Sequence, residues 1–285
     1  MSIENALARR VGELEQDRWL DEPRHLSQRI EALDDLDAYL SDGQPIATEL
    51  QQRARAIHAE LELVNFRLYE DIRRDIRRGA GGARLLEWMP DWTGAAKLAN
   101  CRGYDYLDEL ISGILQFEEP SAAVGQLEPE MVAYQPTPAR HIFDFIGRTA
   151  LTERDLLIDL GSGLGHVPLM ASICSGARCI GIELEPAYVD CARKSARSLD
   201  LNDVRFIQGD ARAAELSDGT VFYFYTPFSG GILREVLNAL RQEAAHRAIR
   251  VCTFGPCTRV VAEEQWLHVM GAVETERIAI FCSRD

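Results

Sequence analysis

The sequence predicts an α/β protein with a doubly wound, seven-strand sheet, preceded by a separate α-helical domain. Three observations support this prediction. Apolar residues keep helical spacing through roughly the first 125 positions, short β-branched runs then alternate with helical segments, and a glycine-rich turn follows the first of those runs. A chain of 285 residues is long enough for two domains. We place the boundary at residue 125, which gives a helical domain over 1–125 and an α/β domain over 126–285.

Helices account for the first part of the chain. Apolar residues that recur at steps of three, four or seven predict helices over about 2–20, 24–41 and 46–78. The third ends at the sequence GAGG (79–82), a strong signal for a helix end. A further helix is expected around 104–118, before a connector that contains Pro120, Gly125 and Pro129.

In the second part of the chain, the spacing of apolar residues changes from a helical one to short strand-like runs. A helix over 137–148 should lead into the first strand, and strands that alternate with helices imply βαβ units and a parallel sheet covered on both faces. The last two strands leave no room for a helix between them, so we expect an antiparallel hairpin. The predicted strands are Leu156–Leu160, Arg178–Glu183, Val204–Gln208, Thr220–Tyr225, Ile249–Phe254, Trp266–Met270 and Ile278–Ser283, and the clearest helices between them are Pro186–Leu199 and Gly231–Ala245.

Composition restricts the partners and the setting. The net charge of −14 opposes binding to nucleic acid and favours neutral or cationic partners. No apolar run is long enough to span a membrane, and the first residues lack the apolar core of a signal peptide, so we expect a cytoplasmic protein. Arg far outnumbers Lys, which hints at a GC-rich bacterial genome. The seven Cys show no C-x-x-C spacing, so no metal site is predicted.

The strongest motif is the sequence DLGSGLG at 159–165, where a predicted strand runs into a glycine turn and then a helix. Glycines let the backbone turn tightly and approach a ligand closely. Three glycines at G-x-G-x-G spacing after an acid resemble motif I of the class I S-adenosylmethionine (SAM)-dependent methyltransferases more than a dinucleotide fingerprint. The resemblance implies a Rossmann-like fold and a SAM site built from Asp159, Gly161, Ser162, Gly163 and Gly165.

Two further strand ends carry acids. Glu183 lies about 20 residues beyond the glycine turn, the spacing expected of an acceptor for ribose hydroxyls. Glu185 precedes a Pro at a helix start and is better suited to the helix dipole. Asp210 and Ala211 end the next strand. In class I methyltransferases the matching acid accepts the adenine amino hydrogens, and the next backbone N–H faces the ring.

The sequence FYFYTPF at 222–228 ends the fourth strand, beside the expected methyl donor. Many amino-methylating enzymes carry Asn/Asp-Pro-Pro-Tyr/Phe here, whereas this chain keeps only the final Pro-Phe and has Tyr225 earlier in the motif. Aromatic walls suit a cationic sulfonium or ammonium. We therefore assign Tyr225 and Phe228 to the site and leave Tyr223 and Phe224 mainly to the core.

The sequence YQPTP at 134–138 precedes the first strand by about 20 residues. Similar Tyr-x-Pro-Ser/Thr segments lie before motif I in some seven-strand protein lysine methyltransferases, including the mitochondrial family that modifies ATP synthase subunit c, where the segment folds over the cofactor. The motif I form also resembles that of the non-SET histone lysine methyltransferases. The resemblance covers residues 130–260. It places Tyr134 in the methyl-transfer cleft and Thr137 at the cofactor, although Thr137 could instead cap a helix.

The sequence therefore predicts a SAM-dependent methyltransferase whose acceptor, a protein amine or a small molecule, is unidentified. The helical domain could cover the acceptor or form a homodimer. Two alternatives stay open: a SAM-fold binding or scaffold protein without turnover, and a nicotinamide-dependent oxidoreductase, which the glycine spacing disfavours. His141, His166 and Cys257 could act as bases, but no partner spacing supports this.

Overall fold

The computed structural model describes residues 2–16, 18–41, 46–88, 104–118, 125 and 127–284. Two compact units can be distinguished, Met1–Arg73 with Asp105–Ile114, and Arg74–Tyr104 with Leu115–Asp285. This division differs from a single boundary at residue 125, because residues 105–114 belong with the first unit while residues on both sides of them belong with the second. Within the described residues, no helix is both long and apolar enough to cross a membrane.

The first unit is helical, as its periodicity predicts. It contains α1 (Ile3–Gln16), α2 (Leu26–Ser41), most of α3 (Thr48–Arg77) and α6 (Tyr106–Leu115), with short 3-10 turns at Arg18–Asp21 and Pro23–His25. Leucines and alanines at helical spacing on α1, α2 and α3 form one apolar core. Arg29 is fully buried there and donates to the backbone oxygens of Leu20 (2.8 Å) and Glu22 (2.6 Å) and to Asn65 Oδ1 (2.6 Å). This buried cation is thus satisfied by hydrogen bonds rather than by a ligand.

The second unit is built on a seven-strand sheet in the order β3-β2-β1-β4-β5-β7-β6. Strands β1 to β5 are parallel, and β7 pairs antiparallel with both β5 and β6. The predicted terminal hairpin is therefore confirmed, with β7 inserted between β5 and β6. The strands are β1 (Leu156–Leu160), β2 (Arg178–Glu183), β3 (Val204–Gln208), β4 (Val221–Phe224), β5 (Arg250–Thr253), β6 (Leu267–Val269) and β7 (Ala279–Ser283).

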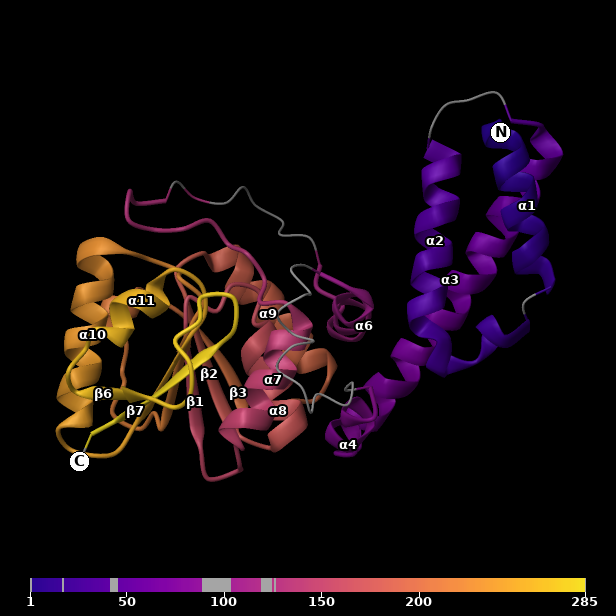
Figure 1. The fold of residues 1–285 in the computed structure, drawn as a ribbon. Helices are drawn as coiled ribbons and strands as arrows, with labels where there is room; N and C mark the ends of the chain where they lie inside the picture. Colours follow the sequence, from indigo (N-terminus) through magenta and orange to yellow (C-terminus); the bar gives the residue numbers. More distant parts are fainter. Residues whose placement is uncertain are drawn as a thin grey trace. The chain divides into compact units, whose positions relative to one another are not determined.

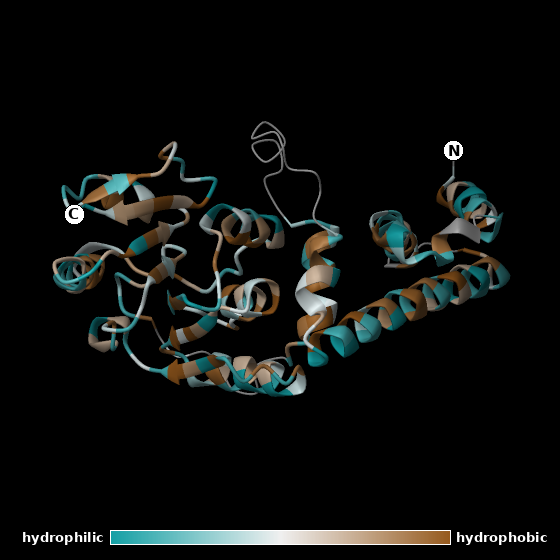
Figure 2. Ribbon diagram, turned by 90° about the horizontal axis from the view of Figure 1, so that it is seen from below, coloured by the Kyte–Doolittle hydropathy of each residue, from teal (hydrophilic) through white to brown (hydrophobic). Residues whose placement is uncertain are grey.

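Helices cover both faces of this sheet, with α7, α8 and α9 on one side and α10 and α11 on the other (Figure 1). Side chains alternate accordingly: Leu156, Ile158 and Leu160 join the core under α10 and α11, whereas Asp159 lies on the face toward α7 and α8. Hydrophobic residues concentrate on the strands, as Figure 2 shows. The helices are α4 (Gly81–Leu86), α7 (Ala139–Thr149), α8 (His166–Ser175), α9 (Pro186–Ser198), α10 (Gly230–Ala244) and α11 (Cys257–Ala262).

The predicted α/β fold is confirmed, with element ends displaced by one or two residues at most positions in the second unit. The GAGG sequence ends α3 at Arg77, as expected, and also starts α4, where a Cβ on Gly82 would lie 2.7 Å from the backbone oxygen of Ile173. Between β3 and β4 the described chain forms only a 3-10 turn, Ala211–Ala213, rather than an α-helix. Pro90 and Pro120 lie outside the described residues.

Candidate functional site

A cavity of about 740 Å³ opens at the carboxyl ends of β1 to β4. This is the edge at which open α/β sheets bind ligands. A segment over 127–138, which we call the strap, runs along the cavity before α7 begins. The strap is joined to the tip of β4 by the bond from Val132 N to Pro227 O (2.9 Å) and by a bridge between Met131 and Phe228. Strap and strand tips therefore form the walls of one pocket.

The glycine turn between β1 and α8 needs its glycines for two reasons. Gly161, Gly163 and Gly165 have φ of 86°, 52° and 88°, in the left-handed region that disfavours other residues. A Cβ would also lie 2.4 Å from Pro227 at Gly161 and 2.0 Å from the Tyr134 ring at Gly163. The turn is thus shaped to bring the strap and the tip of β4 against the backbone.

Asp159 is the last residue but one of β1 and lies at the floor of the pocket, with 3% of its surface exposed. Burial raises the pKa of this carboxyl well above its usual range, and the neighbouring Glu183 raises it further. Ser162 is also buried, and its hydroxyl has no hydrogen-bond partner among the described residues. A buried acid beside a free hydroxyl is suited to an ammonium group, which would restore the charged form of the carboxylate.

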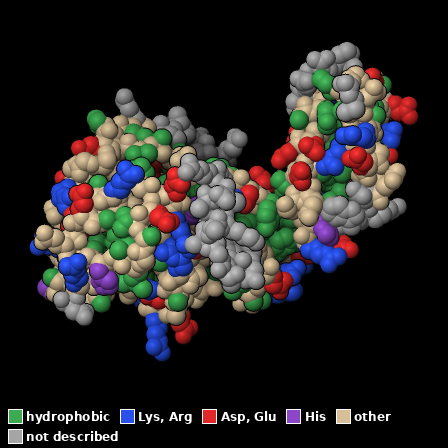
Figure 3. All heavy atoms as spheres, in the orientation of Figure 1, with side chains coloured by type: hydrophobic (Ala, Val, Ile, Leu, Met, Phe, Trp, Pro, Cys, Tyr) green, Lys and Arg blue, Asp and Glu red, His purple; other side chains and the backbone are tan. Residues whose placement is uncertain are grey.

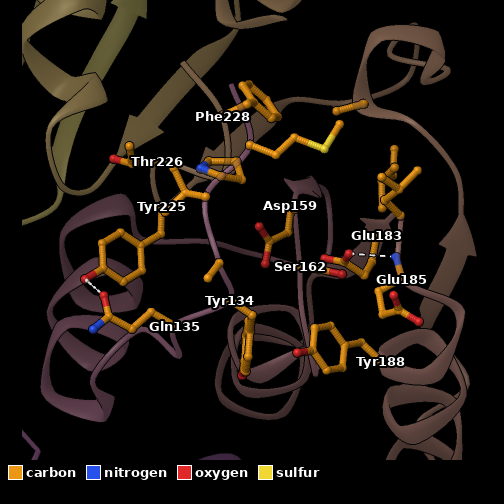
Figure 4. Close-up of a pocket in the computed structure, with 18 of the residues that line it drawn as sticks. Tyr134, Gln135, Asp159, Ser162, Glu183, Glu185, Tyr188, Tyr225, Thr226 and Phe228 are labelled. Atoms are coloured by element: carbon orange, nitrogen blue, oxygen red, sulfur yellow. Dashed lines mark hydrogen bonds between the residues drawn. The ribbon is translucent and has the colours of Figure 1, made fainter. Parts of the chain in front are cut away.

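Glu183 ends β2 with its carboxylate directed at the turn. It accepts hydrogen bonds from the backbone N–H of Gly163 (2.8 Å) and of Glu185 (2.9 Å), which fix its orientation beside Asp159 (Figure 4). Glu185 caps α9 by accepting from Ala187 N, as its place before Pro186 predicted. A carboxylate has capacity for further hydrogen bonds, so Glu183 can also accept from a diol.

Asp210 lies two residues beyond the end of β3, and its carboxylate is already held by a hydrogen-bond partner. Arg212 donates to it from Nε (2.9 Å) and Nη2 (2.6 Å), and this cation lowers the pKa of Asp210. Arg212 also reaches Glu128, near the start of the strap, over 3.2 Å. Sequence reasoning missed Arg212, although its place two residues after Asp210 was a usable signal.

The tip of β4 supplies an uncharged wall. Tyr225 donates to Gln135 Oε1 on the strap (3.3 Å), and its ring centroid lies 4.4 Å from that of Phe254. Thr226 has a φ of 40°, which is strained for a β-branched residue, and its hydroxyl is fixed by donating to Phe254 O (2.8 Å). Phe228 faces the pocket and also belongs to the core, with 4% exposure. Strain at such a tip is common at functional sites.

The strap is tied into the pocket by two hydroxyl contacts. Tyr134 Oη lies 3.1 Å from His166 Nδ1, and burial lowers the pKa of His166 to about 4, so its ring is neutral near pH 7. Thr137 Oγ1 lies 2.8 Å from the hydroxyl of Tyr223, which is buried in β4. Pro138 is the residue that caps α7, so the alternative of Thr137 as a helix cap is wrong.

The pocket thus has two sides that differ in charge. We call the tips of β1 to β3 the acidic half, and the strap with the tip of β4 the neutral half. Of the twelve predicted site residues, Gly163 and Gly165 support the turn from behind without lining the cavity. The other ten line it: Asp159, Gly161, Ser162, Glu183, Asp210 and Ala211 in the acidic half, and Tyr134, Thr137, Tyr225 and Phe228 in the neutral half.

The acidic half fits SAM. Asp159 and the free Ser162 hydroxyl could hold its ammonium and Glu183 could accept from its ribose hydroxyls, and Asp210 and Ala211 line the same half of the cavity. In the described part of the chain, no cluster of three His, Cys, Asp or Glu side chains could hold a metal ion.

Known proteins resemble parts of this chain. A curated histone-lysine N-methyltransferase specific for H3 lysine 79, from Cryptococcus neoformans var. neoformans, is 31% identical over 123 residues, which are 42% of this chain and 18% of that protein. The chain thus spans about a fifth of the length of that relative.

Two solved structures are also similar. An RNA methyltransferase from Salinibacter ruber in complex with S-adenosyl-L-homocysteine is 26% identical and covers 52% of this chain and 92% of its own, with a TM-score of 0.43. A precorrin-6y C5,15-methyltransferase from Geobacter metallireducens is 18% identical and covers 54% of this chain and 93% of its own, with a TM-score of 0.41.

The sequence also matches a family profile described as "Methyltransferase domain" over residues 157–253. That match begins within β1 and ends at the last residue of β5, so it spans the strands whose tips form the pocket. The chain therefore contains a methyltransferase domain over residues 157–253.

Proposed function

We propose that the protein transfers the methyl group of SAM to an amine, the side chain of a lysine in another protein. The observation that carries the proposal is the charge of the pocket. Four carboxylates line it, from Asp159, Glu183, Glu185 and Asp210, while the described lining residues include neither Lys nor Arg. A methyl acceptor with a carboxylate or a phosphate would find no Lys or Arg side chain among these residues, whereas an amine is compatible with the negative potential of the pocket.

The curated relative supports the same acceptor class. It is named for the methylation of lysine 79 of histone H3, and it resembles this chain over 123 residues. Because the match covers only 18% of that protein, it supports the chemistry of the acceptor rather than the identity of the target.

The residues divide the work between the two halves. SAM supplies a methyl group that is already bonded to a sulfonium leaving group. Asp159 and Glu183 would hold its ammonium and ribose in the acidic half, and Tyr134, Tyr225 and Phe228 would line the path of the acceptor. The enzyme then contributes mainly proximity and orientation, which can be worth several kcal/mol.

The neutral half offers no strong base that could remove a proton from the acceptor amine. Burial raises the pKa of the Tyr225 phenol, so this group stays protonated and donates near pH 7. His166 titrates near pH 4 and is hydrogen-bonded to Tyr134. The amine is therefore expected to enter in its neutral form, its alkyl chain passing between Tyr225, Pro227 and Phe228.

We also propose that nucleic acid is not the acceptor and that the protein acts in a bacterial cytoplasm. Acidic and basic side chains are interspersed on the face shown in Figure 3. The net charge of −14 opposes binding to the phosphates of nucleic acid. The described cysteines are free thiols, as favoured by a reducing compartment. The helices of the first unit are proposed to pair two copies of the chain, which light scattering would test.

Labelled-methyl transfer tests the proposed function. The protein is incubated with methyl-labelled SAM and a bacterial extract, the extract is divided by size, and the protein fraction is hydrolysed to amino acids. We expect the label in the protein fraction, as methylated lysine. Label confined to small molecules, or on an oxygen of a protein side chain, would refute the proposal.

A further inference from the structure

The tip of β4 lacks the side-chain amide or acid that many amino-methylating enzymes carry, yet an amide lies beside it. Gln135 comes from the strap, 90 residues earlier in the chain than Tyr225, and the two side chains meet at the mouth of the pocket (Figure 4). Among the described residues that line the cavity, Gln135 has the only side-chain amide. We propose that Gln135 Oε1 accepts a hydrogen from the acceptor amine and orients its lone pair for methyl transfer. This inference rests on the proposed amine acceptor.

The direction of the hydrogen bond selects the oxygen of the amide. The Tyr225 hydroxyl donates over 3.3 Å to Gln135 Oε1, and because burial raises the pKa of this phenol, it remains a donor at neutral pH. An amide oxygen has two lone pairs, so one is left for a second donor. Tyr225 therefore turns the Gln135 carbonyl, rather than its NH₂ group, toward the tip of β4.

The backbone that carries Gln135 is held on both sides. Before it, Val132 N donates to Pro227 O over 2.9 Å, and Tyr134 Oη meets His166 Nδ1 at 3.1 Å. After it, Thr137 Oγ1 meets the buried Tyr223 hydroxyl at 2.8 Å. These contacts fix the strap to β4 and to α8, so the side chain of Gln135 starts from a defined position. A side chain that orients the amine for methyl transfer must itself be placed precisely.

The course of methyl transfer to an amine explains why one hydrogen-bond-accepting carbonyl matters. A neutral amine attacks through its lone pair, and the nitrogen gains positive charge as the N–CH₃ bond forms and the S–CH₃ bond breaks. The N–H groups then become stronger donors, so a carbonyl oxygen that accepts from one of them stabilises the transition state more than the ground state. The proton leaves afterwards to solvent, which fits a neutral half without a strong base.

Two variants and one control test the role of Gln135 in the full chain. Gln135→Leu keeps most of the volume and removes the carbonyl, and Tyr225→Phe releases the amide. Gln242→Leu, on the exposed face of α10, is the matched control. The readouts are the affinity for SAM by calorimetry and the rate of label transfer from saturating SAM into lysines of extract protein.

We expect Gln135→Leu to lower the maximal rate about 10- to 100-fold, the effect of one hydrogen bond that strengthens in the transition state, with SAM affinity within about twofold of wild type. Tyr225→Phe should lower the rate less. The two effects should not add in the double variant, because Tyr225 acts through the amide it orients. Gln242→Leu should match the wild type.

A charged side chain at position 135 distinguishes a role of Gln135 in orienting the amine from a purely structural role. Gln135→Glu should move the pH midpoint of the maximal rate upward, because a carboxylate stabilises the ammonium form of the bound amine, whereas Gln135→Leu should not move it upward. Wild-type rates in Gln135→Leu, or an unshifted profile in Gln135→Glu, would overturn the inference alone. Label on an oxygen acceptor in the wild type would instead refute the proposed function and the inference with it.

Discussion

The acidic half and the neutral half of the pocket are built in different ways. In the acidic half, Asp159, Glu183 and Asp210 lie at or within two residues of the ends of three parallel strands, and these strands are neighbours, which brings the three acids together. In the neutral half, the strap meets the tip of β4 through side chains such as Gln135 and Tyr225, 90 residues apart. The first half depends on local motifs repeated along a regular sheet, and the second depends on how an irregular segment packs.

The difference predicts how the two halves respond to mutation. Changes in the acidic half should act on SAM affinity, and changes in the neutral half should act on the rate with the acceptor. A variant that altered both quantities equally would show that the division is wrong.

The largest expected effect is in the turn of the acidic half. Gly163→Arg must place a side chain where φ is 52° and where a Cβ would lie 2.0 Å from the Tyr134 ring. We expect SAM affinity to fall at least about 1,000-fold, since neither the turn nor the strap can keep its position. Calorimetric titration measures this. Gly147→Arg, on an exposed turn of α7 with open space around it, is the control and should bind normally. Equal SAM binding by Gly163→Arg and wild type would refute the cofactor site.

The second effect is the pH dependence of methyl transfer. Because the described lining of the neutral half offers no base and lysine titrates near pH 10.4, the rate at subsaturating acceptor should rise about tenfold per pH unit between pH 6 and 9. His166, with its pKa lowered to about 4, should add no inflection in that range. Initial rates of label transfer give the profile. An inflection near pH 6.5 that disappears in His166→Gln would show that the imidazole is a base after all.

The two halves of the pocket also differ in how much of them the sequence predicts. Strand tips with acids, and glycines at fixed spacing, are local signals, so the sheet was predicted strand by strand, and the acids expected at its tips do line one cavity. Gln135 was not predicted as a site residue, because its role arises from a contact with Tyr225, 90 residues away in the chain. Arg212 was also missed, although its main partner, Asp210, lies only two residues before it. The helical part was predicted as helices, yet its division into units follows from long-range packing that periodicity does not encode.

The third prediction is that Asp159 has opposite effects on SAM affinity and on the stability of the folded protein. Asp159→Asn should weaken SAM binding about 10- to 100-fold, the range for losing a charged hydrogen bond. The same change should raise the melting temperature of the SAM-free protein above pH 5. The folded state holds the proton of Asp159 more tightly than the unfolded state does, because the folded pKa is raised, so wild-type stability falls as the pH rises through that raised pKa.

Calorimetry and thermal melts at pH 5 and pH 8 measure both quantities. Asp218→Asn, at an exposed acid in the loop before β4, is the control and should change neither. If Asp159→Asn melted lower than wild type at pH 8, the carboxylate would be stabilising the fold, and its assignment to the ligand would lose its physical basis.

The smallest effect separates ligand contact from packing at Thr137, where the strap meets β4. Thr137→Val leaves the buried Tyr223 hydroxyl without its 2.8 Å partner, which should cost about 1–3 kcal/mol in the free energy of unfolding. Adding Tyr223→Phe removes the unpaired hydroxyl as well, so the double variant should recover most of that stability, since replacing both partners by apolar groups is nearly neutral.

Urea unfolding measures the free energy, and calorimetry measures SAM affinity in the same proteins. If Thr137 contacts SAM as predicted, affinity stays about three- to tenfold low in the double variant, as for one neutral hydrogen bond, although stability returns. If affinity returns together with stability, Thr137 acts only by packing the strap on β4, and the cofactor contacts are confined to the acidic half.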